Sequence, residues 1–94
     1  MVSIERFERI SQRVLFERGR QDRLKSEGRF RHTLDDNPGY TDEERLIALL
    51  EEVTEVGKAI MGEKGHIIDG GDIEKELIQV AALAFAWLEG RLDG

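Results

Sequence analysis

The chain has 94 residues, of which 39% are hydrophobic and 36% charged, a balance typical of one small globular domain and not of a disordered chain. It contains no cysteine, which excludes disulfide frameworks, cysteine nucleophiles and thiolate metal sites. It has no apolar run of membrane-spanning length, and residues 1–10 lack the apolar stretch of a secretory signal. We therefore expect a cytoplasmic protein with no membrane partner.

The charge is divided unevenly along the chain. Residues 1–31 hold nine Lys and Arg against five Asp and Glu, a net charge of +4. Residues 32–94 hold five against fifteen, a net charge of −10. An acidic body argues against nucleic acid as the main partner and favours an interaction with cations.

The hydrophobic periodicity predicts three helices in a single helical domain over residues 1–94. The first, residues 3–26, lies in a basic N-terminal region, residues 1–31. Its narrow apolar stripe consists of Ile4, Phe7, Ile10, Val14 and Leu15. Residues 27–40 gather turn-forming residues around Pro38 and are predicted to form a loop.

The second and third helices form a predicted pair over residues 41–91. Thr41 and Glu44 have the spacing of a capping box, and the apolar pattern continues to Met61, before Gly62 and Gly65. Asp72 is placed to cap the third helix, which we expect to end near Glu89, before Gly90.

The third helix is apolar nearly all round its circumference, so it needs burial on nearly every side. Two further helices from so short a chain cannot surround it. The prediction is an all-α chain that forms an oligomer, with the second and third helices supplying most of the shared core.

Carboxylates gather on one flank of each of these two helices. On the second helix, Glu52 and Glu55 lie about 60° apart, with Glu51 slightly further round and Glu52 bordering the apolar stripe. On the third helix, three side chains with oxygen atoms lie within about 60° of one another, because they are four and three residues apart. These are Asp72, Glu76 and Gln79.

Oxygen ligands on two facing helices are how helical bundles build carboxylate metal sites. Without Cys or suitably spaced His, such ligands select Mg²⁺ or Mn²⁺, and Mg²⁺ held by few carboxylates binds substrate phosphates. The alternative reading is an acidic, solvated helix face, which is common in highly charged chains.

Two segments resemble the MazG-like all-α nucleoside triphosphate pyrophosphohydrolases. LIALLEEVTEVGKAI and, some twenty residues later, ELIQVAALAFAWLEG are similar to the family signature E-E-x-x-E followed by E-x-x-D. The segment ERGRQD, residues 17–22, is similar to a stretch that precedes this signature in many phage and bacterial relatives. The resemblance covers roughly residues 15–92.

The resemblance implies a Mg²⁺-dependent enzyme that cleaves an NTP or dNTP to a nucleoside monophosphate and pyrophosphate. It also implies a homodimer or homotetramer with a four-helix core shared between subunits. It implies that Glu52, Glu55 and Glu76 are metal ligands and that Glu51 is an accessory ligand or orients water. Glu51 and Glu52 are the candidate catalytic residues.

Gln79 departs from the family pattern, because it stands where the signature has Asp. An amide oxygen brings no charge to a metal site, so either Asp72 compensates or the site is weak or inactive. The alternative to the enzyme is therefore a catalytically weak or inactive MazG-like helical oligomer with a structural or regulatory role.

The candidate substrate-binding cations are Lys58, one turn after Glu55, and Arg20 in the basic region. Lys58 also has the spacing of an ordinary ion-pair partner of Glu55, which is the role we favour. Three aromatic residues are alternative candidates for contact with the nucleotide base: Phe30, Tyr40 and Trp87. For Trp87, packing in the core is the interpretation that we favour. A nucleic-acid-binding role for the basic region ranks last, because aromatic side chains are not interleaved with its cations for binding single strands.

Overall fold

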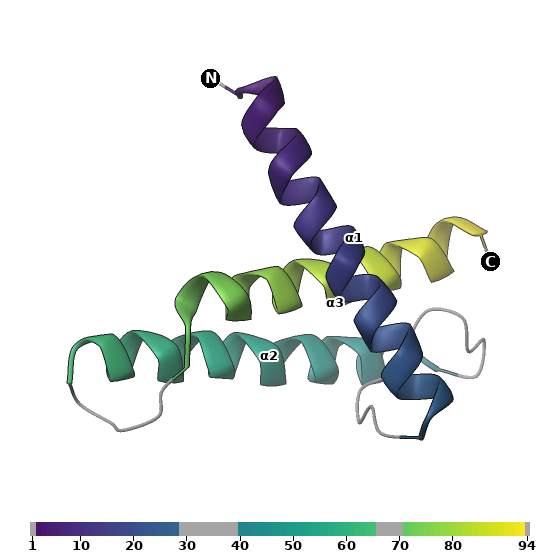
Figure 1. Cartoon of the computed structure of the whole chain (residues 1–94). Helices are drawn as coiled ribbons and strands as arrows, with labels where there is room; N and C mark the ends of the chain where they lie inside the picture. Colours follow the sequence, from purple (N-terminus) through teal and green to yellow (C-terminus); the bar gives the residue numbers. More distant parts are fainter. Residues whose placement is uncertain (1, 29–39, 66–70, 94) are drawn as a thin grey trace.

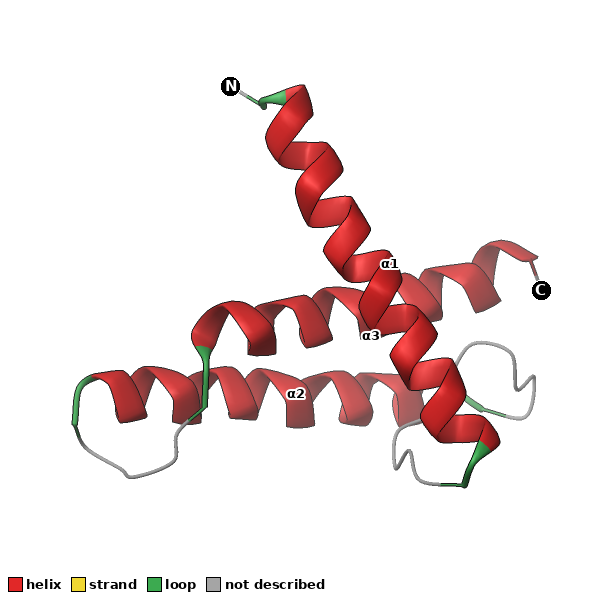
Figure 2. Cartoon of the chain, in the orientation of Figure 1, coloured by secondary structure: helices red, strands yellow, loops and turns green. Residues whose placement is uncertain are grey.

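The computed structural model describes residues 2–28, 40–65 and 71–93. Within these residues the chain forms three helices and no strand: α1 (Ile4–Ser26), α2 (Asp42–Glu63) and α3 (Ile73–Asp93) (Figure 1, Figure 2). The all-α prediction is confirmed. The predicted turn around Pro38, together with Phe30, His32 and His66, lies outside the described residues.

The starts of α2 and α3 follow the predicted caps. Thr41 Oγ1 accepts a hydrogen bond from the Glu44 backbone N–H at 3.1 Å, and Glu44 Oε1 accepts one from the Thr41 N–H at 3.1 Å, which completes the capping box. Ser3 caps α1, and Asp72 Oδ1 accepts from the Lys75 N–H at 3.1 Å. These caps satisfy backbone donors that a helix leaves open at its first turn.

Two helix ends lie beyond the predicted positions. Helix α2 includes Gly62 and ends at Glu63, two residues beyond the expected end near Met61. Helix α3 runs through Gly90 to Asp93, four residues beyond the expected end near Glu89. A single glycine costs a helix only about 1 kcal/mol relative to alanine, and this cost does not end a helix whose neighbours favour it.

Helix α3 packs against both other helices (Figure 1). Helices α2 and α3 run antiparallel side by side, and α1 crosses α3 with its N-terminal half extending beyond the pair. The buried apolar core is small and consists mainly of alanines: Ala48, Ala59, Ala82, Leu83 and Ala86. Alanines at these positions let the α2 and α3 backbones approach closely.

Helix α1 docks through polar side chains and not through its apolar stripe. Its buried residues are Glu17, Arg18 and Gln21, and Gln21 is only 1% exposed. The apolar stripe stays largely exposed, with Phe7 at 63%. The reason is geometric, since the part of α1 that crosses α3 begins after most of that stripe.

Helix α3 remains open to solvent on one side, as expected for a helix that two neighbours cannot enclose. Its exposed large apolar side chains are Leu77, Phe85, Leu88 and Leu92. Among the described residues, no helix is long and apolar enough to cross a membrane.

Asp42 joins the start of α2 to the end of α3. Its carboxylate accepts from Trp87 Nε1 at 2.8 Å and from Arg91 Nη1 at 3.0 Å. We expect Asp42→Ala to lower the free energy of unfolding by about 1 kcal/mol, a modest value because the ion pair with Arg91 is exposed. The emission of Trp87, the only tryptophan, reports the change directly.

The matched control is Glu43→Ala, which removes an acid from the same first turn without touching Trp87. If both variants change stability and Trp87 emission equally, the Asp42 contacts contribute nothing beyond the helix-dipole effect of an acid at this end.

Candidate carboxylate site and basic pocket

Glu52 is the most deeply placed acid of α2. Glu52 is 7% exposed and lies on the face of α2 that packs against α3. A carboxylate there is costly unless polar groups compensate for lost hydration. The prediction that the border of the apolar stripe directs Glu52 toward the helix interface is confirmed.

Gln79 of α3 bridges Glu52 and Glu76. In the amide orientation that satisfies both carboxylates, Gln79 Nε2 donates to Glu76 Oε2 at 2.9 Å and to Glu52 Oε2 at 3.2 Å. The structure thus brings together one acid from each predicted flank and the residue that departs from the family signature. We call Glu52, Glu76 and Gln79 the carboxylate site.

The carboxylate site has an unfavourable excess of negative charge. Burial raises the pKa of Glu76, and the charges of Glu52 and Glu55 raise it further. Both effects penalise the ionised form of the Glu76 carboxyl. A bound cation would relieve this repulsion, so the electrostatics favour cation binding at the site.

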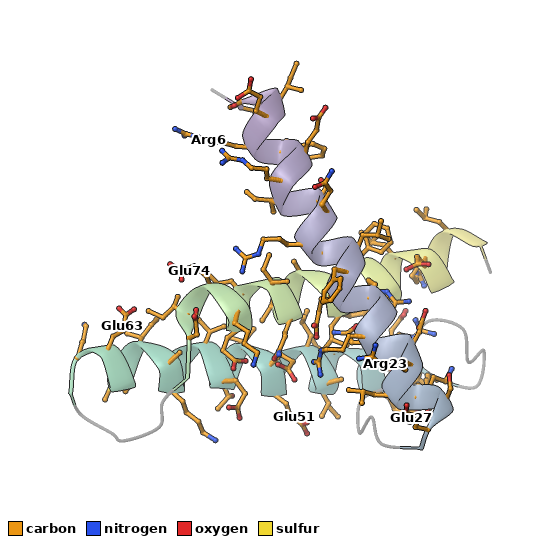
Figure 3. All side chains as sticks on the ribbon, viewed as in Figure 1. Arg6, Arg23, Glu27, Glu51, Glu63 and Glu74 are labelled. Carbon is orange, nitrogen blue, oxygen red and sulfur yellow. The ribbon has the colours of Figure 1, made fainter. Side chains whose placement is uncertain are left out.

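Glu55 and Lys58 lie beside the site, and Glu51 does not. Lys58 Nζ contacts Glu55 Oε1 at 3.2 Å, which confirms the ion-pair role for Lys58. Glu55 is close enough to influence the Glu76 carboxyl. Glu51 is exposed and points away from α3 (Figure 3), so the structure does not join it to the carboxylate site.

Asp72 serves as the N-cap of α3. The backbone N–H of Lys75 lowers the pKa of its carboxyl, because that hydrogen bond stabilises the ionised form. Asp72 is exposed and contributes to the raised pKa of Glu76 only as the smallest of the acidic neighbours. Its side chain is therefore at the edge of the site.

Arg20 connects α1 to the carboxylate site. Its guanidinium donates to both oxygens of the buried Glu17, from Nε at 2.7 Å to Oε2 and from Nη2 at 2.5 Å to Oε1. The hydrogen bonds that Arg20 donates to Glu17 raise the pKa of Arg20, and the charges of Glu17, Glu52 and Glu76 add to this effect. Arg20 thus lies where it faces the acids of both other helices.

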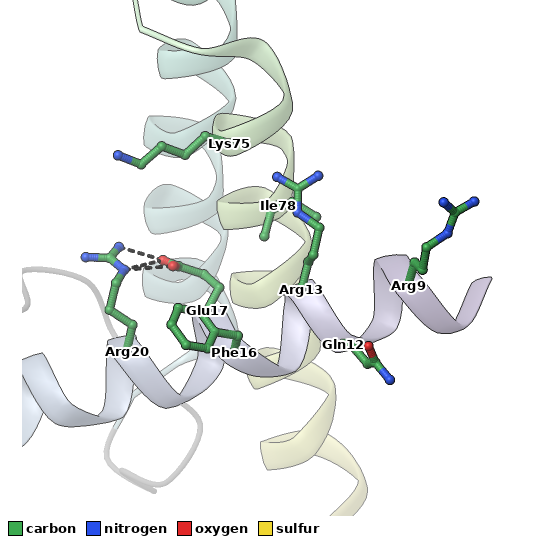
Figure 4. A pocket seen from close by; sticks show the side chains of 8 residues that line it. All are labelled: Arg9, Gln12, Arg13, Phe16, Glu17, Arg20, Lys75 and Ile78. Carbon is green, nitrogen blue, oxygen red and sulfur yellow. Dashed lines mark hydrogen bonds and ion pairs between the residues drawn. The ribbon is translucent and has the colours of Figure 1, made fainter. Parts of the chain in front are cut away.

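A pocket of about 560 Å³ opens between α1 and the first turns of α3 (Figure 4). We call it the basic pocket, because four cations and one carboxylate line it. Its lining residues are Arg9, Gln12, Arg13, Phe16, Glu17, Arg20, Lys75 and Ile78. Sequence reasoning singled out Arg20 but missed Arg9, Arg13 and Lys75. The available signal was the spacing of four and seven along α1, which places residues 9, 13, 16 and 20 on one face.

The oxygen donors of the carboxylate site fit Mg²⁺ or Mn²⁺ held by few protein ligands. Within residues 2–28, 40–65 and 71–93, no group of three or more His, Asp or Glu side chains is placed to hold a metal ion. Two carboxylates with one amide suit a Mg²⁺ ion that keeps several waters and binds substrate phosphates. Gln79 would rotate its amide to turn the oxygen toward the ion.

Gln79→Asp tests the bridging position. In metal-free protein the substitution replaces a donor with a third acid, so we expect the free energy of unfolding to fall by about 1–3 kcal/mol. Mg²⁺ should then raise the melting temperature of the variant more than that of the wild type. Gln79→Ala is the control, because it removes the bridge without adding charge. Equal Mg²⁺ shifts in all three proteins would mean that position 79 is not a ligand.

The arrangement places acids that favour a cation next to a pocket lined by cations. Such a combination suits a ligand that is itself anionic and that binds a metal ion, which is the chemistry of a polyphosphate. No family model, no curated protein and no solved structure matches this chain.

Proposed function

We propose that the chain is a Mg²⁺- or Mn²⁺-dependent nucleoside triphosphate pyrophosphohydrolase of the MazG-like type. The observation that carries the proposal is the convergence of Glu52 and Glu76 from two helices on Gln79. This arrangement joins the two halves of the signature that the sequence resembles. The raised pKa of Glu76 supports a site that is incomplete without a cation.

The reaction is the attack of water on the α phosphorus of an NTP or dNTP. The bond from the α phosphorus to the α–β bridging oxygen breaks, pyrophosphate leaves, and a nucleoside monophosphate and a proton are released. The bound metal ion would supply charge neutralisation and alignment of the phosphates with the water.

The chain's own residues have distinct parts in this proposal. Glu52 and Glu76 hold the cation-binding oxygens in place from α2 and α3, and Glu55 adds negative charge beside them. Arg20 donates three hydrogen bonds to the buried Glu17 carboxylate, through Nε and Nη2, and these bonds fix the orientation of its guanidinium. Trp87, bonded to Asp42, is assigned a packing role and not a base contact.

The protein is also proposed to act as a homodimer or homotetramer. Apolar side chains are exposed on all three helices, including Phe7 on α1, Leu50 on α2 and Leu88 on α3. Exposed apolar surface on this scale is typical of an interface between subunits. Light scattering coupled to size exclusion should give a mass of at least twice 10.7 kDa.

The test of the activity is a panel of NTPs and dNTPs with Mg²⁺ or Mn²⁺, in which released pyrophosphate is measured. We expect turnover with at least one nucleotide, and none after chelation with EDTA. Absence of turnover with every nucleotide, together with absence of a metal-dependent thermal shift, would exclude the enzyme. The chain would then be the inactive helical oligomer that the Gln79 departure allows.

A further inference from the structure

We propose that the basic pocket binds the β and γ phosphates of the nucleotide, the part that leaves as pyrophosphate. This assignment rests on the proposed function for the identity of the ligand. It adds α1 to the substrate site and gives Arg13 and Lys75 a role as phosphate-binding residues.

The basic pocket has a charge opposite to that of the whole chain. The whole chain has a formal net charge of −6, yet this pocket has four cations against Glu17 alone. Arg20 is occupied by Glu17, whereas Arg9, Arg13 and Lys75 make no ion pair with any described residue, and Figure 4 draws none for them. Arg9, Arg13 and Lys75 thus line one pocket of an acidic protein without forming an ion pair with a described residue, which indicates an anionic ligand.

The cations of the basic pocket form an extended array. Arg9, Arg13 and Arg20 follow one face of α1 over eleven residues, about 16 Å of helix at 1.5 Å per residue. Lys75 approaches from the first turn of α3. An extended row of arginines fits a chain of phosphates better than a single carboxylate, because guanidinium groups bind phosphate oxygens in pairs.

This array lies beside the carboxylate site. Arg20 lies close enough to Glu52 and Glu76 for their charges to act on it, and Arg13 acts likewise on Asp72. One end of the pocket is therefore next to the proposed cation, where we also place the bond between the α and β phosphates that is cleaved. The substrate has a nucleoside end and a phosphate end. The β and γ phosphates carry most of the negative charge, so we place them beside the cations.

The size of the pocket separates a small polyphosphate from nucleic acid. Its volume of about 560 Å³ is within the range of small-molecule sites, roughly 300–1,000 Å³. Nucleic acid requires a broad positive surface, and the acidic body of this chain, with its net charge of −10, repels a long polyanion.

The experiment measures the binding of inorganic pyrophosphate to the full chain by calorimetry, in EDTA and without nucleotide. Wild type should bind, and Arg13→Ala or Lys75→Ala should each weaken binding about tenfold, the effect of losing one charge-assisted hydrogen bond. Arg6→Ala is the control, because it removes the same charge from an exposed position of α1 that does not line the pocket. Circular dichroism checks that each variant keeps its helices.

The outcomes distinguish this inference from the proposed function. If pyrophosphate binding depends on Arg13 but no nucleotide is hydrolysed, phosphate binding by the basic pocket is supported and the proposed enzymatic activity is excluded. The opposite result is metal-dependent turnover together with pyrophosphate binding that neither Arg13→Ala nor Lys75→Ala changes. This result overturns phosphate binding by the basic pocket and supports the enzymatic activity. Absence of pyrophosphate binding to the wild type, or tighter Arg13-dependent binding of a single-stranded DNA oligonucleotide, also overturns the inference.

Discussion

Glu52→Gln should reduce pyrophosphate release from nucleoside triphosphates by at least about a hundredfold, since even partners of metal ligands change activity by 10–100-fold. Glu52 is the buried acid of the carboxylate site, and its Oε2 accepts from Gln79 Nε2. Glutamine keeps the size of the side chain but removes the charge that would hold the cation. The measurement is initial rate at saturating Mg²⁺, with the best nucleotide of the panel.

The substitution is informative because it should not unfold the protein. It removes one of the charges that raise the pKa of Glu76, so the metal-free variant loses a repulsion between the two acids. The matched control is Glu63→Gln, which makes the same chemical change at an exposed position near the end of α2. If Glu52→Gln retains the rate of Glu63→Gln, the carboxylate site is not where the reaction takes place.

Glu51→Gln gives a second comparison on the same helix. The sequence resemblance assigns Glu51 an accessory role, whereas the structure places it on the exposed side of α2. The rate of Glu51→Gln should therefore fall much less than that of Glu52→Gln. Equal losses would require Glu51 to act from a neighbouring subunit or through a rearranged α2.

Arg18→Ala should lower the free energy of unfolding by about 3 kcal/mol, the lower end of the range for removing one partner of a buried ion pair. Arg18 is 6% exposed and donates to Glu89 Oε1 at 3.1 Å and to Asp22 Oδ1 at 3.3 Å. The lower end applies because the Glu89 side chain remains 36% exposed and regains hydration. Urea unfolding measured by circular dichroism gives the value.

The same substitution should weaken the packing of α1 on α3, because the buried Arg18 of α1 donates to Glu89 of α3. Arg6→Ala is the control, since a change at an exposed helical position costs no more than about 0.5 kcal/mol. Equal stabilities of the two variants would show that the polar contact between α1 and α3 does not hold the helix.

The local features of this fold were predictable from the sequence. The capping box of Thr41 and Glu44, the N-cap at Asp72 and the ion pair of Lys58 with Glu55 all depend on residues three or four apart. The 3.6-residue period also placed Glu52 at the edge of the apolar stripe, where the structure buries it. These features need only helical geometry, which the sequence specifies within one segment.

The sequence by itself thus determined three helices, their starts and the two acidic flanks. Only the tertiary structure decided that Gln79 bridges Glu52 and Glu76, that polar residues of α1 are buried in place of its apolar stripe, and that a basic pocket forms. Each of these depends on how helices from distant segments cross, as in the contact of Arg18 with Glu89, 71 positions apart. Periodicity specifies the faces of a helix, but it does not specify which face a distant helix will meet.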